Sequence, residues 1–238
     1  TSRIFPKKIL FCSKQSMKQH LALFFPKKRC LFIANGYDFK KIIEKNSENL
    51  FFKKDNNFIF GMAARWHPAK DHKNLFYAIN LLKQKRDDFI VLLAGKGING
   101  NNQDLKRLAL SLNILDKLVL LGPVENIYEF YRSLNCHLLS SSTEAFPNVI
   151  VESMACSIPN ISTDVGDCKD ILGSTGWIVQ ERNSLMFSEA MHKVMVLGKP
   201  FLRDLGYKSK KQVLDRYEIG LIAKEYSNVY NSIKINQK

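Results

Sequence analysis

Short apolar runs alternate with amphipathic segments from residue 58 onward, and this alternation constrains the fold most. Runs that are apolar throughout are typical of strands in a parallel sheet, because helices cover both of its faces. We expect strands at 57–64, 88–95, 117–122, 135–141, 159–163 and 176–180. We expect helices at 72–85, 102–113, 125–133, 148–156 and 183–197. This pattern predicts an α/β fold with a doubly wound parallel sheet.

The two ends of the chain differ from this repeat. The opening residues predict a strand at 8–13, a helix at 16–24 and a strand at 30–34, followed by a turn at Asn35-Gly36 and a polar stretch. Two parallel strands cannot build a covered sheet by themselves, so we interpret residues 1–57 as the end of another domain and its linker. Residues 58–200 then form the main domain, and residues 201–238 form helices that pack back across the domain interface.

The last of these helices carries an apolar stripe that needs a surface to cover. Its members are Leu221, Ile222, Tyr226, Val229 and Ile233.

The formal charge of +14 is concentrated near the start of the chain. Residues 1–57 hold 13 Lys and Arg against 4 Asp and Glu, a surplus of 9. A basic surface can meet nucleic acid, an anionic membrane or only solvent. Because the basic pairs are interleaved with strand-like runs and form no nucleic-acid motif, a nucleic-acid-binding protein is the weaker alternative, and we expect no nucleic acid as a partner.

Cysteine usage and segment lengths point to the cytoplasm. The five cysteines are widely spaced, with no CxxC pair, so we interpret them as buried free thiols in a reducing compartment. No run approaches the roughly 20 apolar residues that span a bilayer, and the opening lacks a secretory signal. Since the sequence opens on Thr1, we expect it to begin within a longer protein.

Open parallel sheets bind ligands beyond the carboxyl ends of their strands, so we expect the ligand-binding residues in the loops that follow the strands. The loop after the first strand of the main domain holds Arg65 and Lys70 around a proline turn. Arginine suits bidentate anion recognition and lysine supplies a point charge, so a diphosphate is a natural target. Exposed loop cations without a ligand are as common in a basic protein. Gly95 opens a Gly-Lys-Gly turn, without the continuation of a dinucleotide or Walker motif.

Two carboxylates, Glu144 and Glu152, bracket a loop-helix junction. The helix is expected to start at Pro147-Asn148, where free N–H groups favour an anion. Glu152 lies about one turn inside that helix among apolar neighbours, and a pair of ribose hydroxyls would supply the donors it needs. Taken singly, Glu144 is a loop residue and Glu152 a favourable charge near a helix start. Their arrangement with the two cations on adjacent loops favours a functional site.

Three segments resemble the signature regions of glycosyltransferase family 4, also called group 1 glycosyltransferases. They are ARWHPAKDHKNLFYA, SSSTEAFPNVIVESMACSIP and STDVGDCKDILGSTGWIV. Upstream, FCSKQSMKQH and IANGYDF resemble the last strand-helix unit of that family's N-terminal domain and its interdomain hinge. The resemblance implies the Rossmann-like C-terminal domain of a GT-B glycosyltransferase with a remnant of the N-terminal acceptor domain.

The resemblance also implies roles for single residues. Arg65 and Lys70 would bind the donor diphosphate, Glu152 the ribose, and Glu144 the transferred sugar, so that Glu144, Arg65 and Lys70 are the expected catalytic residues. The backbone at Phe146, Asn148 and Val149 would contact sugar and phosphate, Val124 would lie by the nucleobase, and Gly95 completes the donor-binding set.

The implied reaction is retaining transfer of a sugar from a nucleoside diphosphate to an acceptor hydroxyl, in bacterial cell-surface polysaccharide or lipopolysaccharide synthesis. Since the sequence has no DxD motif, we expect no metal and no cofactor; Arg65, Lys70 and the helix start at Asn148 would stabilise the departing diphosphate. The acceptor would be a saccharide or a lipid-linked saccharide, and the enzyme would be cytoplasmic, in peripheral contact with an anionic inner membrane. The isolated chain is expected to bind donor but to transfer sugar poorly.

Two departures from the family pattern keep an alternative open. Ala145 and Ser157 stand where the family usually has glycine, and a side chain at Ala145 would narrow the sugar pocket or demand a different φ. The alternative is a catalytically silent nucleotide-binding or scaffold domain. A nicotinamide-dependent oxidoreductase fits less well because the sequence contains no GxGxxG after the first strand of the main domain.

Overall fold

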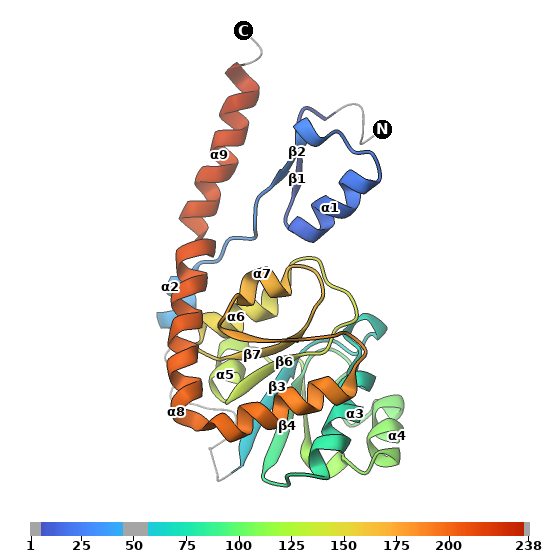
Figure 1. Cartoon of the computed structure of the whole chain (residues 1–238). Helices are drawn as coiled ribbons and strands as arrows, with labels where there is room; N and C mark the ends of the chain where they lie inside the picture. Colours follow the sequence, from blue (N-terminus) through green and yellow to red (C-terminus); the bar gives the residue numbers. More distant parts are fainter. Residues whose placement is uncertain (1–5, 45–56, 236–238) are drawn as a thin grey trace.

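A six-stranded parallel sheet forms the centre of the larger domain (Figure 1). The computed structural model describes residues 6–44 and 57–235. The sheet consists of β3 (Phe58–Ala63), β4 (Phe89–Ala94), β5 (Leu118–Gly122), β6 (Cys136–Leu139), β7 (Asn160–Thr163) and β8 (Gly176–Val179). Their order is β5-β4-β3-β6-β7-β8, with all neighbours parallel. The predicted doubly wound sheet is therefore confirmed, with β3 and β6 at the point where the winding reverses.

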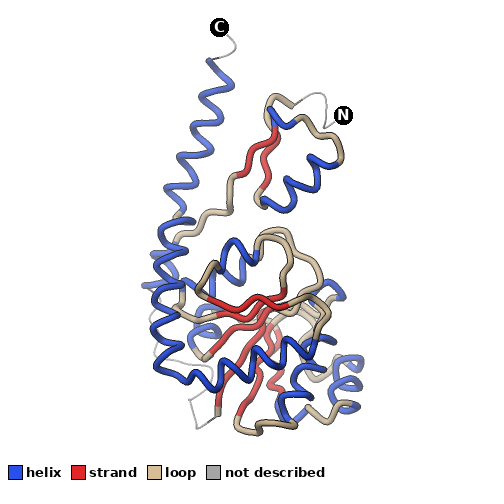
Figure 2. Tube along the Cα trace, in the orientation of Figure 1, coloured by secondary structure: helices blue, strands red, loops and turns tan. Residues whose placement is uncertain are grey.

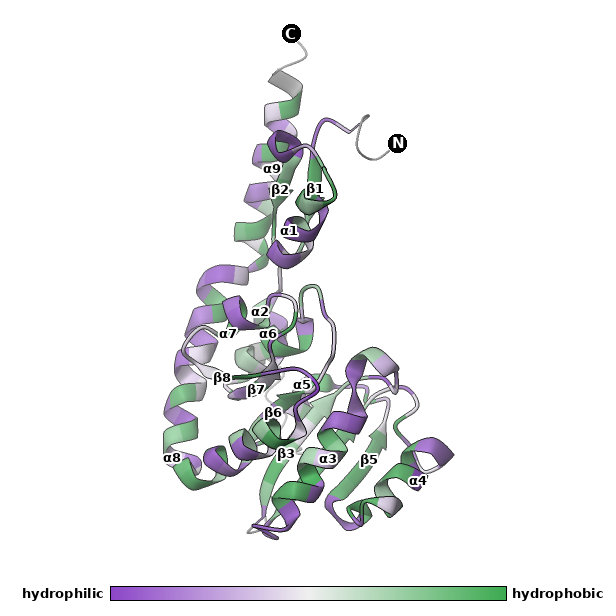
Figure 3. Cartoon of the chain, turned by 45° about the vertical axis from the view of Figure 1, so that its right-hand side comes forward, coloured by the Kyte–Doolittle hydropathy of each residue, from purple (hydrophilic) through white to green (hydrophobic). Residues whose placement is uncertain are grey.

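Helices cover both faces of this sheet, as the apolar runs predict. One face packs against α3 (His72–Lys83), α4 (Gln103–Ser111) and the first half of α8 (Ser184–Tyr217). The other packs against α5 (Ile127–Arg132), α6 (Asn148–Ala155) and α7 (Cys168–Leu172), a short helix that the sequence reading did not include. Along β3, Phe60 and Met62 join the first cluster while Ile59 and Ala63 join the opposite one. In Figure 3 the strands are coloured mostly as hydrophobic, which is why helices must cover them.

The residues before position 45 form a separate small unit above the larger domain (Figure 1). β1 (Ile9–Phe11) and β2 (Cys30–Phe32) pair in parallel, and α1 (Lys14–Ala22) joins them, with a 3-10 turn at Lys27–Arg29. The chain then enters α2 (Phe39–Glu44), within the stretch interpreted as a polar linker. Phe39 and Ile42 are three residues apart and both buried against the α6 cluster, which explains this helix. The rest of that stretch, residues 45–56, lies outside the described residues.

A buried carboxylate joins the two parts. Asp167, just before α7, accepts hydrogen bonds from the Ser13 hydroxyl at 3.0 Å and from the backbone N–H groups of Lys14 at 2.7 Å and Gln15 at 2.9 Å. It thereby satisfies the free donors at the start of α1. Nearby, Asp170 pairs with Lys14 at 3.1 Å and with Arg216 at 2.9 Å. Burial raises the pKa of Asp170, but Lys14 and Arg216 lower it by more, so it lies below its ordinary value.

The C-terminal helices run from the larger domain to the small unit, as Figures 1 and 2 show. α8 turns at Gly198, whose φ is 77°, and its second half packs against α6. α9 (Ile219–Ile235) starts beside the hinge, where a Cβ on Gly36 would lie 2.9 Å from Ile219. Along the expected stripe, Ile222 is buried and Tyr226 and Val229 are partly covered, but Leu221 is 45% exposed. The stripe is therefore narrower than predicted.

All five cysteines are free thiols. Cys30, Cys136 and Cys168 are buried and Cys156 is partly buried, whereas Cys12 is exposed. The expectation of buried thiols is thus wrong for Cys12, which directly follows β1. Burial raises the pKa of the Cys156 and Cys168 thiols to about 12. Among the described helices, none combines the length and the apolar character needed to cross a bilayer.

Ser157 ends α6 in a Schellman motif, with a left-handed backbone at φ 62°. Its N–H donates to the Met154 carbonyl at 2.9 Å, and the Ile158 N–H donates to that of Ser153 at 3.1 Å. Glycine is preferred at this position because it has no Cβ to clash, which explains the glycine typical of the family.

Replacing Ser157 by glycine is therefore expected to stabilise the chain by about 0.5 to 1 kcal/mol, after the greater freedom of glycine in the unfolded state is subtracted. Ser157→Ala keeps the Cβ and should bring no gain. Urea unfolding followed by circular dichroism measures both variants. Equal stability of the two would contradict backbone strain at this position.

Candidate functional site

The loops after β3 and β6 meet at the carboxyl edge of the sheet. The Ser142 N–H donates to the Ala69 carbonyl at 2.9 Å, and the Ser140 hydroxyl donates to the carbonyls of Lys70 at 3.0 Å and Asp71 at 3.1 Å. These bonds involve main chain and a buried serine, so the contact does not depend on the charged side chains nearby. A doubly wound sheet places its ligand at this point of reversal.

Lys70 and Glu144 come from these two loops and form an ion pair. The Lys70 Nζ lies 2.5 Å from the Glu144 Oε1, which also accepts from the Ser141 hydroxyl at 2.7 Å. The two side chains are 24% and 13% exposed, so the pair is only partly open to solvent. Partial burial strengthens such a pair relative to one at the surface.

The turn that carries Lys70 is fixed by its neighbours. The His67 ring accepts from the Ala69 N–H at 3.2 Å, and Asp71, with φ 44°, caps α3 by accepting from the Asn74 N–H at 3.1 Å. Burial, and then the nearby Lys70, lower the pKa of His72 to about 4. His72 is therefore neutral at pH 7 and adds no charge to the loop.

Arg65 follows β3 and is exposed, and no ion pair joins it to another side chain within the described ranges. The structure thus brings Lys70 together with Glu144 but shows no contact between Arg65 and that pair. The backbone here is crowded, because a Cβ on Gly95 would lie 2.2 Å from the Ala64 carbonyl oxygen. Close packing of β3 against β4 thus accounts for Gly95. Val124, after β5, lies half-buried against the α5 side of the sheet.

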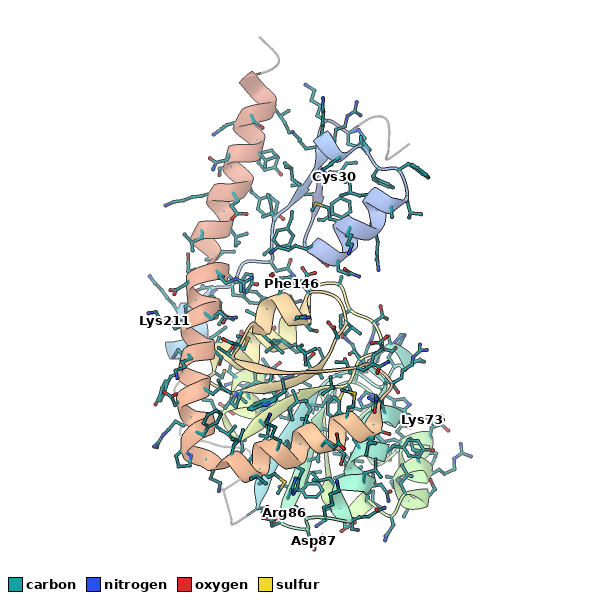
Figure 4. The ribbon with its side chains drawn as sticks, in the orientation of Figure 1. Cys30, Lys73, Arg86, Asp87, Phe146 and Lys211 are labelled. Carbon is teal, nitrogen blue, oxygen red and sulfur yellow. The ribbon has the colours of Figure 1, made fainter. Side chains whose placement is uncertain are left out.

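The start of α6 leaves backbone donors free. Pro147 occupies the cap position without a side-chain hydrogen bond, and the N–H groups of Asn148 and Val149 have no acceptor in the part of the chain that the structure describes. The Phe146 side chain is buried, with its ring 5.5 Å from that of Tyr217, and Figure 4 shows it on the side facing the small unit. Phe146 therefore offers the site only its backbone, and the half-buried Val149 side chain packs against the apolar clusters on this face of the sheet.

The Asn148 side chain is engaged by the hinge. Its Oδ1 accepts from the Tyr37 hydroxyl at 2.5 Å and from the Asn35 Nδ2 at 2.8 Å. Burial and the nearby Glu152 raise the pKa of Tyr37, so this phenol stays a donor. Sequence reasoning missed both partners, since only the folded chain brings residues more than one hundred positions apart into contact.

Glu152 lies one turn further along α6 and lines a cleft of about 680 Å³. Residues of the hinge, of α6 and of α9 form its walls. The Tyr131 hydroxyl donates to the Glu152 Oε2 at 2.9 Å. Burial raises the pKa of Glu152, and the bond from Tyr131 opposes that rise. No feature of the sequence singles out Tyr131.

Ala145 does not demand an unusual backbone. It is exposed and has no left-handed φ, so of the two departures only Ser157 occupies a conformation that favours glycine. The loop against it is tight, because a Cβ on Gly166 would lie 2.4 Å from the Ala145 carbonyl oxygen. Within the described ranges, no three His, Cys, Asp or Glu side chains gather closely enough to hold a metal ion.

Comparison with known proteins identifies a matching family. Residues 43–212 match the sequence profile described as glycosyl transferases group 1. The capsular polysaccharide biosynthesis glycosyltransferase CapM of Staphylococcus aureus is 26% identical over 204 residues, which are 84% of this chain and 53% of that protein. A Campylobacter jejuni 4-alpha-N-acetylgalactosaminyltransferase acting on a diphospho-undecaprenol substrate is 31% identical over 58% of this chain and 35% of its own length. The chain thus spans about half or less of these relatives.

Solved structures share the fold. A glycosyltransferase from Rickettsia africae superposes with a TM-score of 0.84 at 20% identity, covering 95% of this chain and 63% of that one. HepE from Anabaena, solved with UDP and glucose, gives a TM-score of 0.83 at 17% identity, with 97% and 65% covered.

Crowding at Gly166 predicts a sharp response to a single methyl group. Gly166→Ala would place its Cβ against the 144–145 backbone at a left-handed φ of 54°, and we expect it to destabilise the chain by at least about 2 kcal/mol. Gly100→Ala is the matched control, because its nearest neighbour is 3.8 Å away. Thermal and urea unfolding measure both variants. A Gly166→Ala variant as stable as Gly100→Ala would mean that the loop does not pack as described.

Proposed function

The chain belongs to the group 1 glycosyl transferases, and on that premise we propose that its larger domain binds a nucleoside diphosphate sugar where β3 and β6 end. The observation that carries the proposal is the pairing of Lys70 with Glu144 beside the free N–H groups that open α6. A cation, unpaired amides and a helix start together favour a phosphate group.

Each part of the donor has a proposed partner. Lys70, Arg65 and the amides of Asn148 and Val149 would hold the diphosphate, with Arg65 turning in from its exposed position. Glu152, in the 680 Å³ cleft, would accept from the ribose hydroxyls, and Glu144 would face the transferred sugar. Val124 and the turn at Gly95 would lie by the base. HepE, which shares the fold, is solved with UDP-glucose, and this supports a nucleotide sugar as the ligand.

The proposed reaction transfers the sugar to an acceptor hydroxyl with retention and without a metal. Negative charge grows on the departing diphosphate as the glycosidic bond breaks, and fixed donors aimed at that charge lower the barrier. Lys70, Arg65 and the N-terminus of α6 supply such donors. The role of CapM in capsular polysaccharide biosynthesis supports a saccharide or lipid-linked acceptor, and a cytoplasmic site of action fits such acceptors.

Calorimetric titration of the chain with UDP, GDP and ADP tests donor binding. We expect at least one to bind, and Lys70→Ala to weaken that binding by roughly 10- to 100-fold, because a bond to a charged group is lost and Glu144 is left unpaired. Lys73→Ala is the matched control, since Lys73 is exposed on α3 and labelled in Figure 4. Equal affinity of the Lys70 and Lys73 variants would remove Lys70 from the site, and no binding of any nucleotide would overturn the proposed function.

The small unit is proposed to touch an anionic membrane. Phe24 is 89% exposed between α1 and the exposed Lys27 and Lys28. The Lys8 Nζ lies 3.4 Å from the Lys28 carbonyl, so the cations before β1 and β2 share one end of the unit. An exposed aromatic among cations suits an interface of anionic headgroups.

Sedimentation with lipid vesicles, with and without anionic lipid, tests this surface. The double variant Lys27→Gln/Lys28→Gln should weaken binding to anionic vesicles by roughly tenfold or more, because each cation near such a surface contributes about 1 kcal/mol. Lys208→Gln/Lys211→Gln removes the same charge from α8 and should bind as the unchanged protein does. If both pairs behave alike, net charge rather than this surface attracts the chain to lipid.

A further inference from the structure

Tyr131 lies on α5, next to Glu152 of α6. It is fully buried on α5, with its ring 5.6 Å from that of Phe130 and 5.4 Å from that of His137, edge to face in both cases. From there its hydroxyl reaches the Glu152 Oε2 at 2.9 Å. A fully buried ring packed against two others has little room to turn, and this packing orients the hydroxyl toward Glu152.

The other carboxylate oxygen is not used within the described chain. Glu152 Oε1 has no hydrogen-bond partner among residues 6–44 and 57–235, and Glu152 lines the cleft together with Asn148 and Tyr37. When Tyr131 holds one oxygen of a carboxylate that lines a cleft, the second oxygen can accept a hydrogen bond from a ligand while the carboxylate keeps one orientation.

We propose that Tyr131 is a positioning residue for nucleotide recognition, holding the Glu152 Oε2 so that Oε1 accepts from a vicinal diol of the bound nucleotide. This inference rests on the proposed function. Tyr131 touches no ligand in this scheme and acts only through Glu152. Its hydroxyl therefore determines how strongly the site distinguishes a ribose from a sugar without the diol.

The surroundings of Glu152 make this hydroxyl important. Its titratable neighbours come from the hinge, α5, its own helix and α9: Tyr37, Tyr128, Tyr131, Cys156, Tyr226 and Tyr230. None of these six carries a positive charge. Arg132 of α5 and Lys210 of α8 lie near enough to Cys156 to act on its pKa, but Glu152 forms no ion pair among the described residues. Burial of the carboxyl raises its pKa, whereas the bond from Tyr131 favours the ionised form. Without that bond the pKa of Glu152 would rise further.

Tyr131→Phe tests the proposal, with Tyr128→Phe as the matched control. Tyr128 lies one turn earlier on α5 and makes no side-chain hydrogen bond to Glu152. Calorimetry compares UDP with 2′,3′-dideoxyuridine diphosphate for each protein at pH 7. We expect the unchanged chain and Tyr128→Phe to prefer UDP by roughly tenfold or more, and Tyr131→Phe to lose most of that preference while binding the dideoxy compound normally.

The pH dependence gives a second readout that loss of packing would not reproduce. Because the folded pKa of Glu152 lies above its ordinary value, the preference for UDP is present at higher pH and lost as pH falls through that pKa. In Tyr131→Phe the loss should begin at a higher pH. If Tyr131→Phe fails to fold, the pH profile of the unchanged chain still tests the inference. A preference for UDP that stays constant down to pH 4 would overturn it.

The outcomes separate the two proposals. If neither nucleotide binds the unchanged chain, the proposed function fails. If both bind and Tyr131→Phe keeps the full preference for UDP with an unshifted pH profile, the donor site stands and Tyr131 has no positioning role.

Discussion

The backbone bond from Ser142 to Ala69 joins the loops that follow β3 and β6, and the candidate residues Lys70 and Glu144 extend from these two loops. Parallel strands place all their carboxyl ends at one edge, and a doubly wound sheet binds its ligand at the point on that edge where the winding reverses. The buried Ser140 hydroxyl reinforces the same junction, with its one hydrogen shared between the Lys70 and Asp71 carbonyls. Lys70 and Glu144 can therefore meet at 2.5 Å without having to hold their loops together.

The hinge is tied to the same site through Asn148. This side chain accepts from Tyr37 and Asn35, while its backbone N–H remains unbonded within the described chain at the start of α6. One residue thus carries both the hinge contact and the proposed phosphate contact. A rotation of the small unit about residues 35–37 would strain these two hydrogen bonds together with the apolar packing of Ile33 and Ala34 in the cluster around α6. The hinge and the candidate site are linked by short polar contacts, which depend strongly on geometry.

The sequence predicted the strands of the larger domain because their apolar runs reflect burial on both faces, and with the strands it predicted which loops share an edge. It did not predict α2. The two apolar residues that define this helix, Phe39 and Ile42, are recognised as buried only once the α6 surface that covers them is known. The contact of Tyr131 with Glu152 joins two helices and residues 21 positions apart, so no periodicity in the sequence indicates it. The exposed position of Arg65 and the limits of the α9 stripe likewise depend on packing.

The loop at 164–167 connects the small unit to the carboxyl edge of the sheet, where the candidate site lies. Asp167 uses its carboxylate to satisfy three donors at the start of α1, while its own N–H donates to the Ala145 carbonyl at 3.0 Å. Gly166 packs so closely on the backbone of residues 144 and 145 that no side chain fits. Any displacement of the small unit that pulls on Asp167 must therefore also move the support under Glu144. Since polar contacts of this kind are directional and apolar ones are not, this loop fixes the relative position of the two parts more narrowly than burial alone would.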